Sequence, residues 1–309
     1  MLAAGIVWRL REQRPVQSKF DVVPITTYPG IEMQPSLSPD GAQVAFSWNG
    51  PTQQKAHIYV KAIGPGPPLQ LTKDTKDDVA ASWSPDGGEI AFLRDQGNGH
   101  FNVMLIPALG GPERKLTDIF VPDIEWMPGP YLTWTPDSRS LVLPDRIAKE
   151  KPVALFVFPV QVGDKRQLTF PPGGMLGDAC AALSPDGRTL AFCRCSHLGG
   201  WVIDLYTVAL DSNLTPQSEV KVPEHFIRPT GLAWNSQNRT DRRSRPGQCT
   251  GAGEIAGAKP PRPPSDRVAG GHRELAHYSA PFCAPGLLSL VWGRREHLAF
   301  ADSRTRQSS

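Results

Sequence analysis

The sequence contains none of the short motifs that mark common hydrolases, metalloproteases and protein kinases. A Gly-x-Ser-x-Gly elbow, a His-Glu-x-x-His zinc pair, and the Gly-rich loop, HRD and DFG signatures of kinases are all missing from its 309 residues. Gly251–Ala256 matches a loose dinucleotide fingerprint, but no strand precedes it and no helical pattern follows. We therefore predict a protein that is not an enzyme, with no catalytic residues, no cofactor and no metal site.

Cysteine is scarce, and its five copies lack the paired spacing that zinc sites require. In a strand, Cys193 and Cys195 would share one face and Cys180 would lie on the opposite face. We expect these three, with Cys249 and Cys283, to be reduced and mostly buried thiols. Such thiols occur on either side of a membrane, so they leave the compartment open.

The N-terminus lacks an apolar run long enough to cross a membrane. Eight apolar residues precede Arg9, whereas a membrane helix needs about 20. A signal peptide would begin with basic residues, and this stretch does not. Two interpretations of residues 1–19 stay open: an unstructured leader, or the last turns of a membrane helix that begins upstream of Met1.

The net charge of +3 hides two regions of opposite sign. Residues 236–309 carry 11 Arg and one Lys against six acidic residues, a net charge of +6, whereas residues 1–235 have a net charge of −3. Binding to nucleic acid relies on basic surfaces. Because residues 1–235, which contain the strand-like segments, carry a small net negative charge, we expect no nucleic-acid partner.

What the sequence does contain is a repeated hairpin. Ser, Pro, Asp and Gly suit successive positions of a type I turn, and short apolar runs flank each turn. We expect two strands around a three-residue, Gly-containing loop with a bulge. The near-complete copies are "QPSLSPDGAQVAFSW" (Gln34–Trp48), "AASWSPDGGEIAFLR" (Ala80–Arg94) and "CAALSPDGRTLAFCR" (Cys180–Arg194), with a divergent copy at Leu132–Leu143.

Each hairpin is followed by a second pair of strand-like runs, of which the second ends in Leu-Thr in three copies. The turns begin at Ser38, Ser84, Thr135 and Ser184, at intervals of about 46–51 residues, and a degraded turn follows near Asn235. Four short strands in such a period are typical of a propeller blade. We predict an all-β propeller with four-stranded antiparallel blades over residues 34–72, 80–117, 131–169 and 180–222.

The strands are apolar on both faces, as expected for blades packed between two neighbours. In blade four, simple counting from the turn places Ala182 opposite Leu190 and Cys180 opposite Phe192. The first strand of a fifth blade is legible at Thr230–Trp234, and Phe20–Thr26 matches a fourth strand that lacks strands one to three. We therefore expect an incomplete propeller over residues 20–235, open because this closing strand has no partner.

Three carboxylates recur at one position, six residues before the turn: Glu32, Asp78 and Asp178. In a propeller this position opens on the mouth of the central channel, so these residues are candidate ligand-binding residues. A partial ring of acids can bind a cation or a basic peptide. The alternative is that each carboxylate accepts backbone N–H groups within its own loop.

Residues 236–309 do not continue the pattern. They are rich in Arg, Pro and Gly, a composition typical of disorder. The arginines also suit binding to an acidic surface. A third interpretation is translation out of frame, because the repeat stops within a blade and Arg far outnumbers Lys.

The repeated SPDG hairpin followed by Leu-Thr resembles the TolB-type, WD-repeat-like β-propeller over roughly Phe20–Trp234. The wording "FDVVPITTYPGIEMQPSLSPDGAQVAFSWNG" is similar to extracytoplasmic propellers of bacterial membrane kinases and winged-helix regulators. The resemblance implies about six blades and a binding or sensor role on the periplasmic or outer side of the cell membrane. It also implies a protein or small ligand at the propeller mouth, and membrane association through a helix upstream. The alternative is a propeller fragment of a prolyl-oligopeptidase-like serine peptidase that lacks its hydrolase domain, which the 74 residues of the tail are too few to form.

Overall fold

The structure is a computed structural model that describes residues 22–52, 54–122, 131–161, 163–196, 202–227, 232–234, 287–289 and 299–301. Every regular element in these residues is a β-strand, and none of them is a helix that would span a membrane. The predicted leader, residues 1–19, and all but two short strands of the tail lie outside the described residues.

Four antiparallel sheets of four strands form the blades, as predicted, and within each sheet the strands follow chain order. Blades 1 and 2 consist of β2 (Glu32–Leu37), β3 (Gln43–Trp48), β4 (His57–Ala62) and β5 (Leu69–Gln70), then β6 (Asp78–Trp83), β7 (Glu89–Gly97), β8 (His100–Pro107) and β9 (Arg114–Phe120). Blades 3 and 4 consist of β10 (Thr133–Trp134), β11 (Ser140–Asp145), β12 (Ala154–Pro159) and β13 (Arg166–Gln167), then β14 (Gly177–Leu183), β15 (Thr189–Cys195), β16 (Val202–Leu210) and β17 (Pro216–Ile227).

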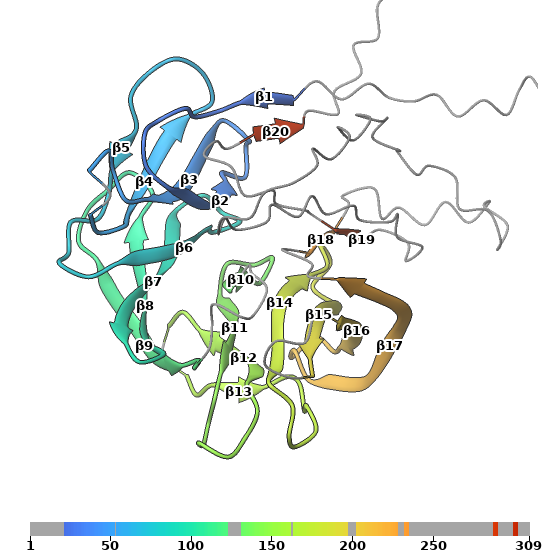
Figure 1. The fold of residues 1–309 in the computed structure, drawn as a ribbon. Coiled ribbons are helices and arrows are strands. Elements are labelled where there is room, and N and C mark those ends of the chain that lie inside the picture. The colour runs from blue at the N-terminus through green and yellow to red at the C-terminus, as the bar shows by residue number, and fades with distance from the viewer. Residues whose placement is uncertain are drawn as a thin grey trace, which may run out of the picture.

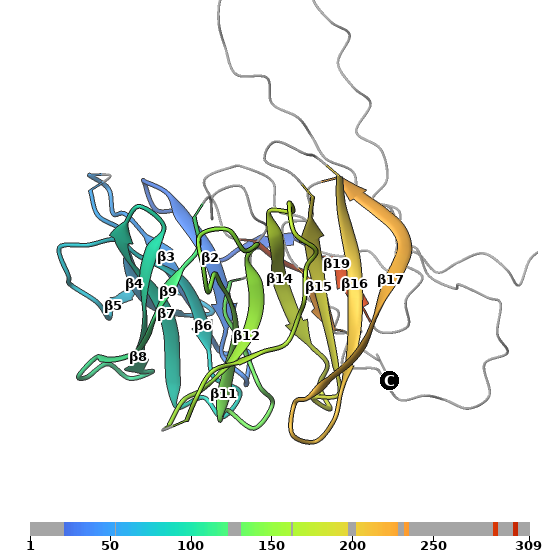
Figure 2. The ribbon, with the colours of Figure 1, turned by 90° about the horizontal axis from the view of Figure 1, so that it is seen from below.

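The blades surround an axis, with the first strand of each nearest the centre and the later strands farther out (Figure 1). Seen from below, they stand side by side (Figure 2). Their apolar faces therefore meet between blades, and the core is a series of layers. One layer joins Ile58 of blade 1 to Phe92 and Ile106 of blade 2, and another joins Leu155 of blade 3 to Phe192 of blade 4. This packing confirms that the strands are apolar on both faces.

The repeated turn is built in the same way in all four blades. In blade 1 the amide of Gly41 donates to the carbonyl of Ser38 at 2.8 Å, which closes the turn. The hydroxyl of Ser38 donates to Asp40 Oδ1 at 2.5 Å and accepts from the amide of Gln43 at 2.9 Å. These hydroxyl bonds lower the pKa of Asp40, and Ser84 and Ser184 have the same effect on Asp86 and Asp186.

The loop is one residue longer than expected. Ser38 and Gln43 close it through a backbone hydrogen bond of 2.9 Å, which leaves four loop residues, and the other blades are identical in this respect. In blade 4, Leu183 therefore pairs with Leu190 and Ala182 pairs with Ala191, so the predicted pairing of Ala182 with Leu190 is wrong.

A β-bulge in the inner strand then shifts the register by one residue. Beyond the bulge, Ala179 pairs with Cys193 and Asp178 pairs with Arg194. These pairs agree with the register obtained by counting residues from the turn. Blades 1 and 2 have their bulge at the same place. In each, the residue four before the turn adopts a left-handed conformation: Gln34 (φ 51°), Ala80 (φ 58°) and Cys180 (φ 54°).

The two ends of the array differ from the prediction. The prediction that the closing strand lacks a partner is wrong: β1 (Val22–Pro24) pairs antiparallel with β20 (Ala299–Ala301). The expected first strand of a fifth blade is present as β18 (Leu232–Trp234), which pairs with β19 (Leu287–Ser289). Two strands thus come from the region predicted to be a tail, and Figure 1 shows them beside β1 and β18.

Candidate functional site on the propeller axis

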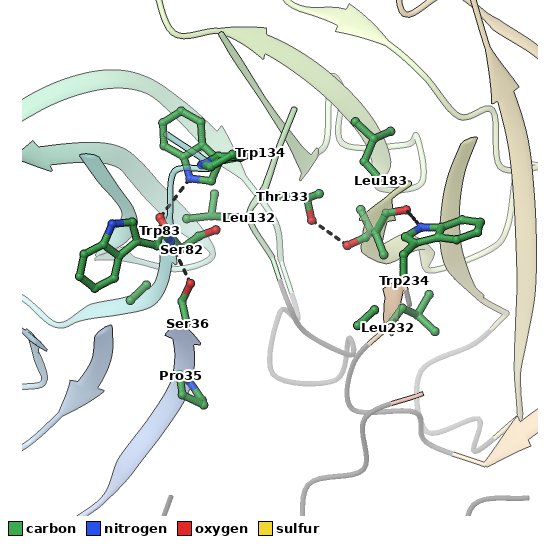
Figure 3. Close-up of a pocket in the computed structure, with 15 residues that line it drawn as sticks. Pro35, Ser36, Ser82, Trp83, Leu132, Thr133, Trp134, Leu183, Leu232 and Trp234 are labelled. Carbon is green, nitrogen blue, oxygen red and sulfur yellow. Dashed lines mark hydrogen bonds between the residues drawn. The ribbon is translucent and has the colours of Figure 1, made fainter. Parts of the chain in front are cut away.

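A cavity of about 360 Å³ lies where the inner strands converge (Figure 3). It is lined by residues at the three positions before the turn in each repeat, two of them in blade 1 and all three in each of the others, together with Pro85 of blade 2. None of the lining residues is charged: they are Pro35, Ser36, Ala81, Ser82, Trp83, Pro85, Leu132, Thr133, Trp134, Ala181, Ala182, Leu183, Leu232, Ala233 and Trp234. The cavity is therefore a neutral site with small residues and tryptophans in its wall.

Side chains of one blade hold the inner strand of another in place around this cavity. The indole of Trp134 donates to the carbonyl of Ser82 at 3.0 Å, and the indole of Trp234 donates to the carbonyl of Ala182 at 2.9 Å. Both bonds are drawn in Figure 3. Ser36 accepts from the amide of Trp83 at 2.9 Å. Because inner strands have no neighbour on the axial side, these bonds satisfy backbone groups that would otherwise need water.

The predicted acidic residues do not line this cavity. Asp78 is the first residue of β6 and Asp178 is the second residue of β14, and each is fully buried. Asp78 accepts two hydrogen bonds from its register partner Arg94, Nε at 2.7 Å and Nη2 at 3.0 Å. Asp178 does the same with Arg194, at 2.7 and 2.9 Å. The guanidinium groups lie on the second strand, so these two carboxylates are engaged within their own blades.

Each arginine is held by further groups. Arg94 also bonds Glu113 at 2.7 Å, and Arg194 bonds Glu219 at 2.9 Å and lies 4.5 Å above the ring of Tyr206. Burial would lower the pKa of Arg194, but Asp178 and Glu219 outweigh it and raise that pKa. Burial raises the pKa of Asp178, against the opposite effects of Arg194 and of the Thr169 hydroxyl. The geometry is that of an ionised, two-point pair.

Glu32 occupies the same position in blade 1, and its environment differs. Its register partner is Trp48, and its Oε2 accepts from the hydroxyl of Thr26 at 2.5 Å. Thr169, at the end of blade 3, likewise donates to Asp178 of blade 4. Thr26 and Glu32 therefore have the same relation as Thr169 and Asp178, which lie at the end of blade 3 and near the start of blade 4. This agreement supports the prediction that Phe20–Thr26 takes the place of a fourth strand.

Sequence reasoning missed the polar centre of blade 3. Ten residues after the turn position, where Arg94 and Arg194 stand, blade 3 has Asp145. Asp145 is 3% exposed, accepts from the amide of Phe120 at 2.9 Å, and pairs with Lys165 at 2.5 Å. Counting forward from the turns, as well as backward, would have found all three residues.

The hypothesis that Glu32, Asp78 and Asp178 bind a ligand stays a prediction. The three lie at equivalent strand positions, but two of them already face an arginine, which meets much of their need for a cation. Among the described residues, no group of three or more His, Cys, Asp or Glu side chains is placed to hold a metal ion. The cavity is the better candidate for a binding site because its wall is open to a neutral ligand.

Comparison with known proteins finds relatives of the fold. No family model matches the chain. The uncharacterised peptidase YuxL of Bacillus subtilis strain 168 is 28% identical over 117 residues, which cover 35% of this chain and only 16% of that protein. A putative TolB from Agrobacterium tumefaciens matches with a TM-score of 0.48 and 21% identity, over 66% of this chain and 69% of that one. Prolyl oligopeptidase B from Galerina marginata matches with a TM-score of 0.48 and 14% identity, over 68% and 33%. At such identities the likeness concerns the fold, and the four blades themselves establish it.

Proposed function

We propose that this chain is a non-enzymatic binding or sensor module whose axial cavity takes a protein segment or a small ligand. The observation that carries the proposal is the uncharged cavity between the inner strands of the four blades and β18. Pockets with an apolar wall and a few polar groups are the usual form of ligand sites. Here Ser82 lines the wall from an inner strand, and small residues such as Ala182 leave room beside it.

The electrostatics of the cavity support a neutral occupant. A charged ligand would leave water for a site without a charged residue in its wall, which is costly. A nucleic acid would need basic groups, and none lines the cavity. We therefore expect an uncharged small molecule or an apolar protein segment as the ligand.

The test is to fill the cavity. Ligand-observed NMR on the full chain would screen matched uncharged and charged small molecules, and we expect binders among the uncharged ones. Ser82→Phe places a large side chain in the cavity and should abolish their signal, whereas Thr75→Phe, at an exposed loop position, should not. Binding that persists in a folded Ser82→Phe variant, verified by circular dichroism, would refute the axial site.

Within this proposal, the module belongs to the extracytoplasmic part of a membrane signalling protein, on the periplasmic or outer side. The support is the resemblance of the SPDG repeats to such propellers. The parent gene decides the question. We expect a kinase or winged-helix domain and a membrane span upstream of residue 1, and their absence would remove the membrane role while leaving the cavity untouched.

A second candidate is the propeller of a serine peptidase, favoured by the 117-residue match to a protein named as a peptidase. The two candidates differ in what the parent gene encodes beyond this chain. Sequencing of the gene tests them: a serine-hydrolase domain encoded downstream would favour the peptidase, whereas a kinase or winged-helix domain and a membrane span encoded upstream would favour the sensor module.

A further inference from the structure

The bulge of blade 4 brings two cysteines to the same face. Cys193 on β15 has Ala179 as its register partner, and the next pair along the strands is Ala182 with Ala191. Cys180, at the bulge, therefore follows Ala179 without the usual alternation of sides. The expectation that Cys180 lies opposite to Cys193 and Cys195 is wrong, because all three belong to one buried cluster.

The thiols of Cys180 and Cys193 are in direct contact. They share a hydrogen bond, and their residues are 0% and 1% exposed. The three cysteines of blade 4 are reduced in the structure. A disulfide spans Cα atoms about 4.4–6.8 Å apart, and Cys180 directly follows Ala179, the register partner of Cys193 on the adjacent strand.

This pair is a property of one blade and not of the repeat. At the positions of Cys180 and Cys193, blade 2 has Ala80 and Leu93, and blade 1 has Gln34 and Ser47. Ala80 and Leu93 pack in the core between blades, and Gln34 accepts a hydrogen bond from the amide of Ala80, so the fold does not require sulfur at these positions. A thiol pair in contact across two strands has a chemistry that alanine and leucine lack.

We propose that Cys180 and Cys193 form a reversible disulfide that locks the inner strand of blade 4, with a low-molecular-weight disulfide as the oxidant. The thiolate of one cysteine attacks the oxidant, giving a mixed disulfide and releasing one small thiolate. The second cysteine attacks the mixed disulfide, forms the protein S–S bond and releases the other small thiolate. The two protons lost by the cysteines are taken up by the released thiolates, so two protein thiols are oxidised and one small disulfide is reduced.

The site is slow to react in the closed blade. The hydrogen bond with Cys180 and burial both raise the pKa of Cys193, and burial raises the pKa of Cys195 to about 12. Thiolate is the attacking species, and the oxidant must reach the buried pair. Oxidation therefore requires blade 4 to open, and the rate should saturate at high oxidant concentration once opening becomes limiting.

The bond would fix the wall of the axial cavity. Ala181, Ala182 and Leu183, which follow Cys180 directly, line it. A covalent link beside them holds the left-handed bulge and closes a short chain loop, which restricts the unfolded state. The inference rests on blade 4 alone and stands whether or not the cavity binds a ligand.

The test is disulfide mapping of the full chain. Reduced protein would be equilibrated with graded ratios of oxidised to reduced glutathione, both natively and by refolding from urea, then alkylated, digested and analysed by mass spectrometry. We expect one linked peptide pair, Cys180 with Cys193, an alkylated Cys195, and a Tm higher by on the order of 5 °C in the oxidised form.

Two variants complete the test. Cys195→Ala should keep the link, and Cys193→Ala should abolish both the link and the rise in Tm. No link after refolding in the most oxidising buffer overturns the proposal. A link that joins Cys193 to Cys195, or that uses Cys249 or Cys283, overturns it as well.

Discussion

Blades 2 and 4 place a buried carboxylate and a buried arginine opposite each other, whereas blades 1 and 3 fill the same two positions differently. Blades 2 and 4 have Asp78 with Arg94 and Asp178 with Arg194. Blade 3 has its carboxylate, Asp145, on the second strand, and Asp145 forms an ion pair with Lys165, which directly precedes β13. Blade 1 keeps Glu32, which accepts a hydrogen bond from the hydroxyl of Thr26, two residues after β1.

The difference shows what the fold demands at this point. The position lies near the ends of two strands of a blade, where backbone N–H groups of the neighbouring blade need acceptors: the amide of Phe120, the last residue of β9, donates to Asp145. Any carboxylate that serves them is taken out of water and needs a partner. The fold therefore fixes the need for a matched polar pair and leaves open which strand carries which charge.

The largest effect should come from leaving Asp178 without its cation. Arg194→Met should lower the free energy of unfolding by about 3–5 kcal/mol at neutral pH, measured by urea denaturation. Arg188→Met, at an exposed site, should change it little. The double variant Asp178→Leu with Arg194→Met should be more stable than the single one, and the reverse order would contradict the charge-based account.

The same variant has a pH signature. The pKa of Asp178 is already raised from its ordinary value of 3.8 in the folded protein, and loss of Arg194 removes an effect that lowers it. A raised folded-state pKa adds stability at low pH, which is lost as pH rises through that pKa. The penalty in Arg194→Met should thus be small near pH 4 and should grow toward pH 7.

Blade 3 should respond less to loss of charge. Asp145→Asn keeps an acceptor for the amide of Phe120, and the Lys165 side chain is 40% exposed, so the freed ammonium can turn to water. We expect a loss of about 1–2 kcal/mol by urea denaturation. A loss as large as that of Arg194→Met would mean that the two kinds of centre are equivalent.

Blade 1 offers a smaller test through its hydroxyl. Thr26→Val removes the donor to Glu32 and should cost about 1 kcal/mol in unfolding free energy. Thr26→Ser keeps the hydroxyl and serves as the control. No loss in Thr26→Val would show that the bond to Glu32 does not stabilise the fold.

The smallest effect concerns the turn of blade 3, where Ser138 replaces the glycine of the other turns and has φ 59°. Ser138→Gly relieves this left-handed strain but loses the bond from the amide of Asp86 at 3.0 Å. We expect a gain of at most about 1 kcal/mol in thermal unfolding. The matched exchange in blade 4, Gly187→Ser, should lose stability, and a gain there would contradict the strain argument.

The sequence was sufficient for the blades because their signals are local. Pro39 and Gly41 set a turn at fixed offsets, and apolar runs such as Val44–Phe46 mark the strands. The bulge was not legible, because Ala80 and Cys180 adopt a left-handed conformation without the glycine that usually announces it. The longer loop and the bulge shift the register in opposite directions, so simple counting failed near the turn and succeeded at Asp178.

The candidate site was only partly within reach. The acidic positions were found by repetition, but their arginine partners come from tertiary pairing across strands. The cavity depends on how five inner strands converge, which no single repeat contains. The partner of β1 was not foreseen either, because β20 is three residues long and lies in a region without any blade pattern.

The tryptophan bonds around the axis also set an order of events during synthesis. The carbonyl of Ser82 is bonded by Trp134, and that of Ala182 by Trp234, each 52 residues later in the chain. A ribosome makes the N-terminal part first, so every such blade waits for the first strand of a later one before its inner edge is covered. Folding of the array should trail translation by about one repeat, and a pause within a blade would expose the axial edge of the blade before it.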